Sequence, residues 1–345
     1  MAYNVRYVKG IHLSQIREEW KALESGEEMT LFQSYQWYLV LLEHYVPVDT
    51  GNYESLYAVV ESDGHPCMIA PLWVVKHTFR LLNHKGVYML GRGSFSDYLN
   101  LVYRHFDGNA FDYLSNDLAR RFGVTYFTIE QLRETTSVYR HILANYVVRR
   151  NSEYPCVGLN LPHSVEDYNR LLSKNSRQNI RTANNRLKKD GKNLVYNFDD
   201  QEIDKKRCLA IREAKQLVNY SKLPLLYRYK YKILNIFRYH FNSFIPFISF
   251  PESKVMTACD EEGNLRAFFN YGYDSEERCI RVMTAGTDLD FARYSPGMLL
   301  MYNFILNSIQ EDNLREIDFT RGDEKYKFAL GGQQRTNHTV KFKIK

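Results

Sequence analysis

Apolar and polar positions along the first half of the chain predict a mixture of strands and helices. Residues 5–8 alternate as in a short strand, and Ile16, Trp20 and Leu23 recur at helical spacing. The runs 56–61 and 67–75 flank a Ser-Asp-Gly turn, which predicts a β-hairpin because Asp-Gly favours the tight turns of hairpins. The same patterns predict helices at 34–45, 111–122 and near 141–145, and a strand at 124–130.

The second half repeats this order of elements. Helical patterns lead to a second hairpin, in which residues 261–264 form the turn. The predicted elements are helices at 171–189, 203–218 and 229–241, hairpin strands at 254–260 and 265–273, a strand at 279–286, a helix at 295–310, a strand at 315–320, a helix at 323–330 and a strand at 336–344. The repetition predicts two copies of one α/β fold, with domains at 1–154 and 155–345.

Composition agrees with two folded domains. At about 150 residues per domain, 345 residues correspond to two. The hydrophobic fraction of 44% and the charged fraction of 25% exclude a disordered chain. The formal net charge of +6 permits an anionic partner without requiring one.

Cysteines and termini indicate a cytoplasmic protein without a metal framework. The five cysteines are scattered with no CxxC pair, and no spaced cluster of histidines appears. The N-terminal residues lack the apolar core of a signal peptide. The longest apolar run, near 68–75, is far shorter than the roughly 18 residues of a membrane span.

The strongest local signal is Ser295-Pro296-Gly297-Met298-Leu299. Serine suits the N-cap of a helix and proline its first position, and Gly297 would let an outside group approach the backbone. The first amides of a helix have no internal partner, so this one could bind a phosphate or pyrophosphate. The preceding strand, with Thr284 and Ala285 near its end, would bring a ligand past its edge. The alternative is a well-capped structural helix.

A second signal follows the strand at 315–320, where Gly322 marks a turn before a short charged helix. In open α/β sheets ligands bind at the carboxyl ends of strands, which places Asp318, Glu324, Tyr326 and Lys327 near a cleft. A carboxylate there could accept a proton from a nucleophile, and a tyrosine could return one to a leaving thiolate. The alternative is that Asp318 caps the turn and that the Lys/Glu pairs are surface ions.

A basic ridge is the third signal. At about 100° per residue, five cations of the 171–189 helix and its end lie within roughly 60° of one another. They are Lys174, Arg177, Arg181, Lys188 and Lys192. Such a ridge could hold an anionic substrate or nucleic acid, although a solvated helix face is the more common reason for it. The Gly91-Arg92-Gly93 segment lacks the third glycine of a dinucleotide fingerprint and is interpreted as a turn, followed by Asp97 and Tyr98.

Together these residues resemble the CelD/BcsL-type acetyltransferases of the GNAT superfamily, which are related to the FemAB-like aminoacyl transferases. The resemblance covers most of the chain. It depends on the motifs Leu31-Phe32-Gln33-Ser34 with Trp37, Pro71-Leu72, Asp97-Tyr98, Lys174-Asn175-Ser176-Arg177 with Arg181 to Gly191, Ser295-Pro296-Gly297 with Leu300, and Asp318-Phe319 with Gly322, Glu324, Tyr326 and Lys327.

The resemblance implies two tandem GNAT-like domains, each a mixed, mainly antiparallel sheet flanked by helices. It implies that acetyl-CoA or another acyl-CoA binds at Arg293–Leu299, where Tyr294-Ser295-Pro296-Gly297 replaces the usual glycine-rich loop. The implied cofactor-binding residues are Thr284, Ala285, Arg293, Ser295, Gly297, Met298 and Leu299. Tyr326 is the nearest match to the thiolate-protonating tyrosine of many GNAT enzymes.

The first functional hypothesis is therefore an acyl-CoA-dependent N- or O-acyltransferase, with acetyl-CoA as the expected donor. Its acceptor would be a sugar-derived or other small molecule, with a link to exopolysaccharide synthesis. Its expected base is Asp318 or Glu324, its acid Tyr326, and its substrate-binding residues Arg177, Arg181, Asp97, Tyr98 and Lys327. One alternative is a FemAB-like aminoacyl transferase that uses charged tRNA, which the basic ridge would fit. Another is a non-catalytic binding protein with the same fold.

Overall fold

The computed structural model describes residues 2–44, 53–75, 86–93, 96–221, 249–274 and 277–344, and the helix expected at 229–241 lies outside them. The chain forms two units. The first unit comprises Met1–Pro155 with Thr336–Lys345, and the second comprises Cys156–Arg335. The domain expected at 155–345 therefore differs from the second unit by Pro155 and the last ten residues, which belong to the first.

The first unit contains a sheet with the strand order β1-β2-β3-β4-β5-β12. All neighbouring pairs are antiparallel except β4 and β5, which are parallel. Its elements are β1 (Tyr3–Lys9), η1 (Gly10–Ile16), α1 (Arg17–Leu23), η2 (Leu31–Gln33), α2 (Tyr35–His44), β2 (Tyr53–Ser62), β3 (His65–Val75), β4 (Gly86–Met89), α3 (Gly108–Phe122), β5 (Tyr126–Arg133), α4 (Ser137–Asn145) and the first part of β6 (Val147–Asn160), with most of β12 (Gln333–Lys343).

The second unit repeats this arrangement with the order β7-β8-β9-β10-β11-β6, in which β10 and β11 are the parallel pair. The expected α/β fold, with a mixed and mainly antiparallel sheet in each half, is thus confirmed. The elements are α5 (Val165–Leu171), α6 (Lys174–Lys189), β7 (Val195–Asn197), α7 (Lys205–Ser221), β8 (Ser253–Cys259), β9 (Leu265–Asp274), β10 (Cys279–Thr287), η3 (Ala292–Tyr294), α10 (Pro296–Glu311), β11 (Glu316–Arg321) and α11 (Lys325–Ala329).

Both predicted hairpins are present. Strands β2 and β3 pair up to Ser62 and His65, and Asp63 and Gly64 between them both have positive φ, as a type I′ turn requires. Strands β8 and β9 form the second hairpin. The helix expected at 171–189 is α6, which begins three residues later, at Lys174. Leu172 is extended, and the Ser173 hydroxyl accepts a hydrogen bond from the amide of Ser176 as the cap of this helix. Helix α5 was not predicted.

Strand β6 passes from the first unit into the second without interruption, so the boundary expected between residues 154 and 155 falls inside a strand. The return connection is β12. Its Phe342 side chain is fully buried against Phe127 and Tyr146, with ring centroids 5.5 and 5.0 Å away. This burial is the physical reason why the C-terminal residues belong to the first unit.

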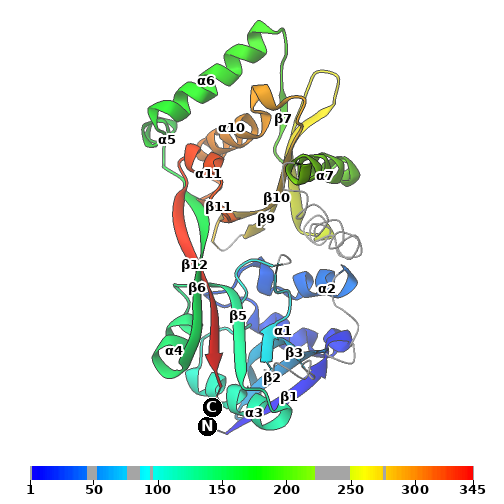
Figure 1. Cartoon of the computed structure of the whole chain (residues 1–345), viewed down its shortest axis with the longest axis vertical. Coiled ribbons are helices and arrows are strands. Elements are labelled where there is room, and N and C mark those ends of the chain that lie inside the picture. Colours follow the sequence, from blue (N-terminus) through cyan, green and yellow to red (C-terminus); the bar gives the residue numbers. More distant parts are fainter. Residues whose placement is uncertain are drawn as a thin grey trace. The chain divides into compact units, whose positions relative to one another are not determined.

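Helices cover both faces of the second unit's sheet. Ile280, Val282, Ile317 and Phe319 face the larger core, which includes residues of α5, α6 and α10. A smaller cluster on the other face joins Phe268 of β9 to α7. Figure 1 shows α10 and α7 on opposite sides of β9 and β10. Alternation along a strand therefore decides which helices each side chain can meet.

Candidate active site

The parallel strands β10 and β11 separate part-way along their length. They pair from Cys279 and Glu316 to Arg281 and Asp318, but β10 continues to Thr287 and β11 to Arg321. Met283 is an extra residue in β10, because the register with β9 shifts between Val282 and Thr284. Past this point the edge of β10 that faces β11 pairs with no strand among the described residues. An open edge of this kind offers backbone groups to a ligand.

Helix α10 begins beside this open edge. Ser295 precedes the helix in the left-handed region with φ 51°, and its hydroxyl makes no capping bond. Pro296 occupies the first turn and has no amide hydrogen. The amide of Leu299 is bonded to Ser295, so Leu299, which is fully buried, does not offer the expected contact to a ligand.

The amides of Gly297 and Met298 donate to no acceptor among the described residues. Gly297 is nevertheless buried, and a Cβ there would lie 2.8 Å from Oγ1 of Thr287. Close packing of α10 against the end of β10 is therefore enough to require a glycine at this position. Met298 is half-buried and lines a cavity. The start of α10 is thus packed on one side and adjoins a hollow on the other.

Contacts to the end of α6 fix the loop before α10. The Tyr294 hydroxyl donates to Asp190 at 2.7 Å, and the Arg293 guanidinium pairs with the same carboxylate at 2.9 Å. The hydrogen bond from Tyr294 and the charge of Arg293 lower the pKa of Asp190. Nη1 of Arg186 donates to the carbonyl of Arg293 at 2.9 Å. The position of the α10 N-terminus is consequently set by α6, which precedes it by about a hundred residues in the sequence.

A cavity of about 300 Å³ lies between α6, α10 and α11. Its wall carries the cations Arg186 and Lys325, the polar side chains of Asn179 and Thr182, and the ring of Tyr326. The complete lining is Asn179, Thr182, Ala183, Arg186, Ser295, Met298, Lys325, Tyr326 and Ala329. Two cations beside unbonded helix N-terminal amides favour an anionic ligand.

Tyr326 connects this cavity to the core. Its ring packs against Phe319 and Phe269, with centroids 6.1 and 6.3 Å away. Burial, with a smaller contribution from Glu324, raises the pKa of Tyr326 well above its ordinary value, while Arg212 acts in the opposite direction. The hydroxyl therefore stays protonated at neutral pH, which is the state needed to donate a proton.

The other predicted catalytic and substrate-binding residues of this loop have different surroundings. Asp318 points to the face opposite Phe319 and Tyr326, where its Oδ2 lies 3.7 Å from Nε of the buried Arg281. The ammonium of Lys327 is buried and donates to the carbonyls of Arg321 and Gly322, so it holds the turn. Glu324 pairs with Lys327 at 2.8 Å but keeps 59% of its side chain exposed.

The predicted basic ridge faces away from the cavity. Asn179, Thr182 and Arg186 line the cavity, and at about 100° per residue the ridge lies roughly 140° around α6 from them. Arg177 donates to the carbonyl of Asn169 at 2.8 Å and so holds the end of α5. Arg181 is exposed. The cation of α6 that lines the cavity is Arg186, which the ridge did not include.

Asp97 and Tyr98 are buried in the first unit, with 3% and 5% of their surface exposed. The carbonyl of Tyr98 accepts a hydrogen bond from Gln33 at 2.7 Å, and the indole of Trp37 donates to Ser96 at 2.8 Å. The Phe-Gln-Ser and Asp-Tyr motifs therefore hold two segments of the first unit together. Their burial leaves little of either predicted substrate-binding residue accessible to a ligand.

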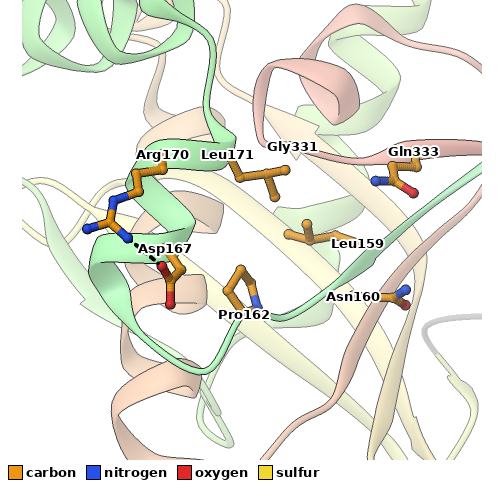
Figure 2. Close-up of a pocket in the computed structure, with 8 residues that line it drawn as sticks. All are labelled: Leu159, Asn160, Pro162, Asp167, Arg170, Leu171, Gly331 and Gln333. Atoms are coloured by element: carbon orange, nitrogen blue, oxygen red, sulfur yellow. Dashed lines mark hydrogen bonds and ion pairs between the residues drawn. The ribbon is translucent and has the colours of Figure 1, made fainter.

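A second cavity, of about 440 Å³, is lined by none of the predicted residues. Figure 2 shows its polar rim, where Arg170 and Asp167 form an ion pair at 2.9 Å, and its aliphatic wall around Leu159. Its lining is Leu159, Asn160, Pro162, Asp167, Arg170, Leu171, Gly331 and Gln333. The smaller cavity combines two cations with the start of α10, where two amides are unbonded among the described residues, and we therefore regard it as the candidate site.

The described residues contain neither a membrane-spanning helix nor a metal-binding cluster. Their helices include none that is long and apolar enough to cross a membrane. Within the same ranges, no three His, Cys, Asp or Glu side chains are grouped as metal ligands.

Comparison with known proteins agrees with this topology. Residues 259–328, which run from the end of β8 to α11, match the family described as acetyltransferase (GNAT) domain. The crystal structure of FemX is similar over 98% of this chain and 96% of its own, with a TM-score of 0.58 and 10% identity. Residues 259–328 are thus similar to a GNAT domain, and the two units repeat one arrangement of strands.

Further solved structures are similar to this chain. A conserved protein of unknown function from Bacteroides thetaiotaomicron is similar over the whole of both chains, with a TM-score of 0.53 and 12% identity. A tandem GNAT protein from the clavulanic acid biosynthesis pathway covers 100% of this chain and 99% of its own, with a TM-score of 0.49 and 10% identity. Sequence comparison with curated proteins gives no match. At these identities the likeness concerns the fold.

Proposed function

We propose that this protein is an acyl-CoA-dependent N- or O-acyltransferase that acts on a small acceptor. The observation that carries the proposal is the separation of β10 from β11 next to the start of α10, which also lines the cavity. An open strand edge can hold an extended arm, and a cationic cavity with free amides can hold its phosphates. One extended ligand with a phosphorylated end would satisfy both features.

The phosphate end of the donor would bind the amides of Gly297 and Met298. Arg186 and Lys325 would supply positive charge from two different helices. Contacts from Asp190 and Arg186 hold the loop at Arg293 and Tyr294 before the donor arrives. Preorganisation of this kind reduces the entropy that binding must otherwise remove.

The arm of the donor would lie along β10 beyond Val282, with its thioester near Tyr326. A bound acyl-CoA supplies an activated acyl group and a thiolate leaving group. The chain's own contribution is to orient the reacting groups and to move protons. Tyr326 would donate its hydroxyl proton to the departing sulfur, and its raised pKa keeps that proton in place at neutral pH.

Glu324 is the base that the geometry favours. Its carboxylate is exposed and lies on the same turn as Tyr326, whereas Asp318 is buried on the other face of the sheet. A sugar-derived amine or hydroxyl is the acceptor class suggested by the motifs that resemble CelD/BcsL-type acetyltransferases. That resemblance also supports a place in polysaccharide synthesis and acetyl-CoA as donor.

Titration calorimetry with acetyl-CoA and longer acyl-CoAs tests the donor site. We expect Arg186→Ala and Lys325→Ala each to weaken binding about 10-fold, equivalent to about 1.4 kcal/mol. Arg181→Ala is the matched control, because it removes a cation from the opposite side of the same helix and should leave affinity unchanged. Absence of binding by any acyl-CoA at millimolar concentration would remove the proposal.

A further inference from the structure

Arg212 brings a cation to the open edge of β10 from the other face of the sheet. It lies on α7, whose Ile211 packs so close to Gly286 that a Cβ on the glycine would be 3.1 Å from Cγ2 of the isoleucine. Nη1 of Arg212 donates to the carbonyl of Ala285 at 2.8 Å. The guanidinium is therefore anchored to the strand itself, and not only to its side chains.

The carbonyl of Ala285 belongs to the unpaired part of β10. The carbonyl of Val282 faces β11, because it accepts the hydroxyl of Thr320 at 2.9 Å. Met283 is an extra residue in the strand. Val282 and Ala285 therefore pair with Tyr271 and Phe269, which are two residues apart on β9. Carbonyls two residues apart in a strand point the same way. Arg212 thus binds the edge of β10 along which a donor arm would lie.

Arg212 of α7 interacts electrostatically with Tyr326 of α11 and with Glu324, the residue that precedes this helix. Burial lowers the pKa of Arg212 to about 10, and the nearby Tyr326 and Glu324 partly oppose that change. In return, Arg212 lowers the pKa of Tyr326, which burial and Glu324 raise. The pKa of Arg212 thus falls from its ordinary 12.5 to about 10, which is still well above neutral pH, so the guanidinium remains charged.

We propose that Arg212 is a positioning residue of the transfer site, which fixes the open end of β10 through Ala285 and sets the charge beside the Tyr326 hydroxyl. This inference depends on the proposed acyltransferase function. Among the described residues, the other charged groups that act on Tyr326 or share its cavity are Glu324 and Lys325 on its own turn and helix, and Arg186 from α6. Of these cations, Arg212 alone is bonded to β10.

The test compares Arg212→Met and Arg212→Lys with Arg207→Met. Arg207 is a matched control because it lies on the same helix and also donates to a backbone carbonyl, that of Gly263 at 3.0 Å. We expect Arg212→Met to lower kcat about 100-fold, in the range known for loss of one preorganised electrostatic partner. The donor Kd should change less than threefold, Arg212→Lys should recover part of kcat, and Arg207→Met should behave as wild type.

A double variant separates positioning from general stabilisation. If Arg212 acts through Tyr326, adding Arg212→Met to Tyr326→Phe should lower kcat only a few-fold further. Wild-type kcat in folded Arg212→Met, or an equal loss in Arg207→Met, would overturn the inference while leaving the acyltransferase proposal intact. If Arg212→Met does not fold, unchanged kcat in Arg212→Gln would overturn it equally. No thiol release by the wild-type protein with any acyl-CoA would instead remove the proposed function and this inference with it.

Discussion

The ring of Tyr326 packs against Phe319, and the residue also lines the cavity. Removing only its hydroxyl should therefore leave the fold unchanged. We expect Tyr326→Phe to lower kcat about 100-fold with little change in donor Kd, because general acid catalysis commonly contributes that much. Burial raises the pKa of this hydroxyl above its ordinary value of 10.0. Wild-type kcat should therefore show no alkaline loss from Tyr326 between about pH 7 and about pH 10.

The matched control for this prediction is Tyr302→Phe. Tyr302 also belongs to the second unit and packs against Tyr168, with ring centroids 6.0 Å apart, but it does not line the cavity. Its loss should leave kcat unchanged. Equal activity of Tyr326→Phe and wild type in a thiol-release assay would show that another group protonates the leaving sulfur.

The sequence located part of the candidate site and missed the rest for identifiable reasons. Ser295, Met298 and Tyr326 stand next to motifs that mark helix starts, and all three line the cavity. Arg186 and Arg212 come from helices far away in sequence, so only the packing of α6 and α7 brings them to the site. The burial of the Lys327 ammonium depends on the path of its turn, which charge patterns do not reveal.

At the scale of elements, the junction between β10 and α10 depends on a missing side chain at Gly297. An added Cβ would lie 2.8 Å from Oγ1 of Thr287, which is too close for an ordinary contact. We expect Gly297→Ala to cost about 1–3 kcal/mol of stability and to raise the donor Kd, since overpacking would displace the helix start. Denaturant unfolding and calorimetry of the same samples measure both effects.

The partner residue provides the control for this junction. Thr287→Ala removes the opposing hydroxyl and should recover much of the stability that Gly297→Ala loses, whereas Thr287→Val keeps a group of similar size and should not. Purely additive effects of Gly297→Ala and Thr287→Ala would mean that the two residues are not in steric conflict.

The β8–β9 hairpin makes a prediction about acid stability. Burial alone would raise the pKa of Asp260, but hydrogen bonds from Asn264 and Arg266 lower it to about 2. A depressed pKa means that the carboxylate stabilises the fold above its ordinary pKa of 3.8, and that this contribution is lost as the pH falls toward about 2. Asp260→Asn should cost about 1–3 kcal/mol at neutral pH.

Urea unfolding of wild type and Asp260→Asn across this range checks the sign. The two stabilities should converge as the pH falls from 3.8 toward about 2, because protonation then removes the charge that the substitution already lacks. A constant difference between the two proteins would mean that Asp260 acts by packing and not by its charge. Asp199→Asn is a suitable comparison, because its ion pair with Lys254 is exposed and should matter little.

The reliability of the element predictions followed the strength of local signals. Asp63-Gly64 predicted a hairpin because the turn needs two positive φ angles that these residues adopt easily. The sequence did not predict the start of α6 at Lys174, because Ser173 lies in a polar stretch that also suits a helix interior. Only the hydrogen bond from the amide of Ser176 identifies Ser173 as the cap. Local chemistry thus predicts elements better than it predicts where they end.

At the scale of the whole molecule, the repeated order of elements was visible in the sequence, but the crossing of the chain between units was not. Strand β6 begins in the first unit and ends in the second, and β12 returns in the opposite order. Pairing of β12 with β5 joins residues more than 190 positions apart, from Asn337 with Arg133 to Lys343 with Tyr126. Periodicity identifies a strand and does not select its neighbour.

Because β12 completes the first unit, truncation after Arg335 should destabilise that unit selectively. The lost residues pair with β5, and they include the buried Val340 and Phe342. We expect amides of β5 to lose hydrogen-exchange protection in the truncated chain, and Phe342→Ala to reproduce the effect at a cost of about 3–5 kcal/mol. Phe328→Ala is the control, because this ring of the second unit is 39% exposed. Faster exchange in β9 and β10 with unchanged β5 would instead place the stabilising contacts of β12 in the second unit.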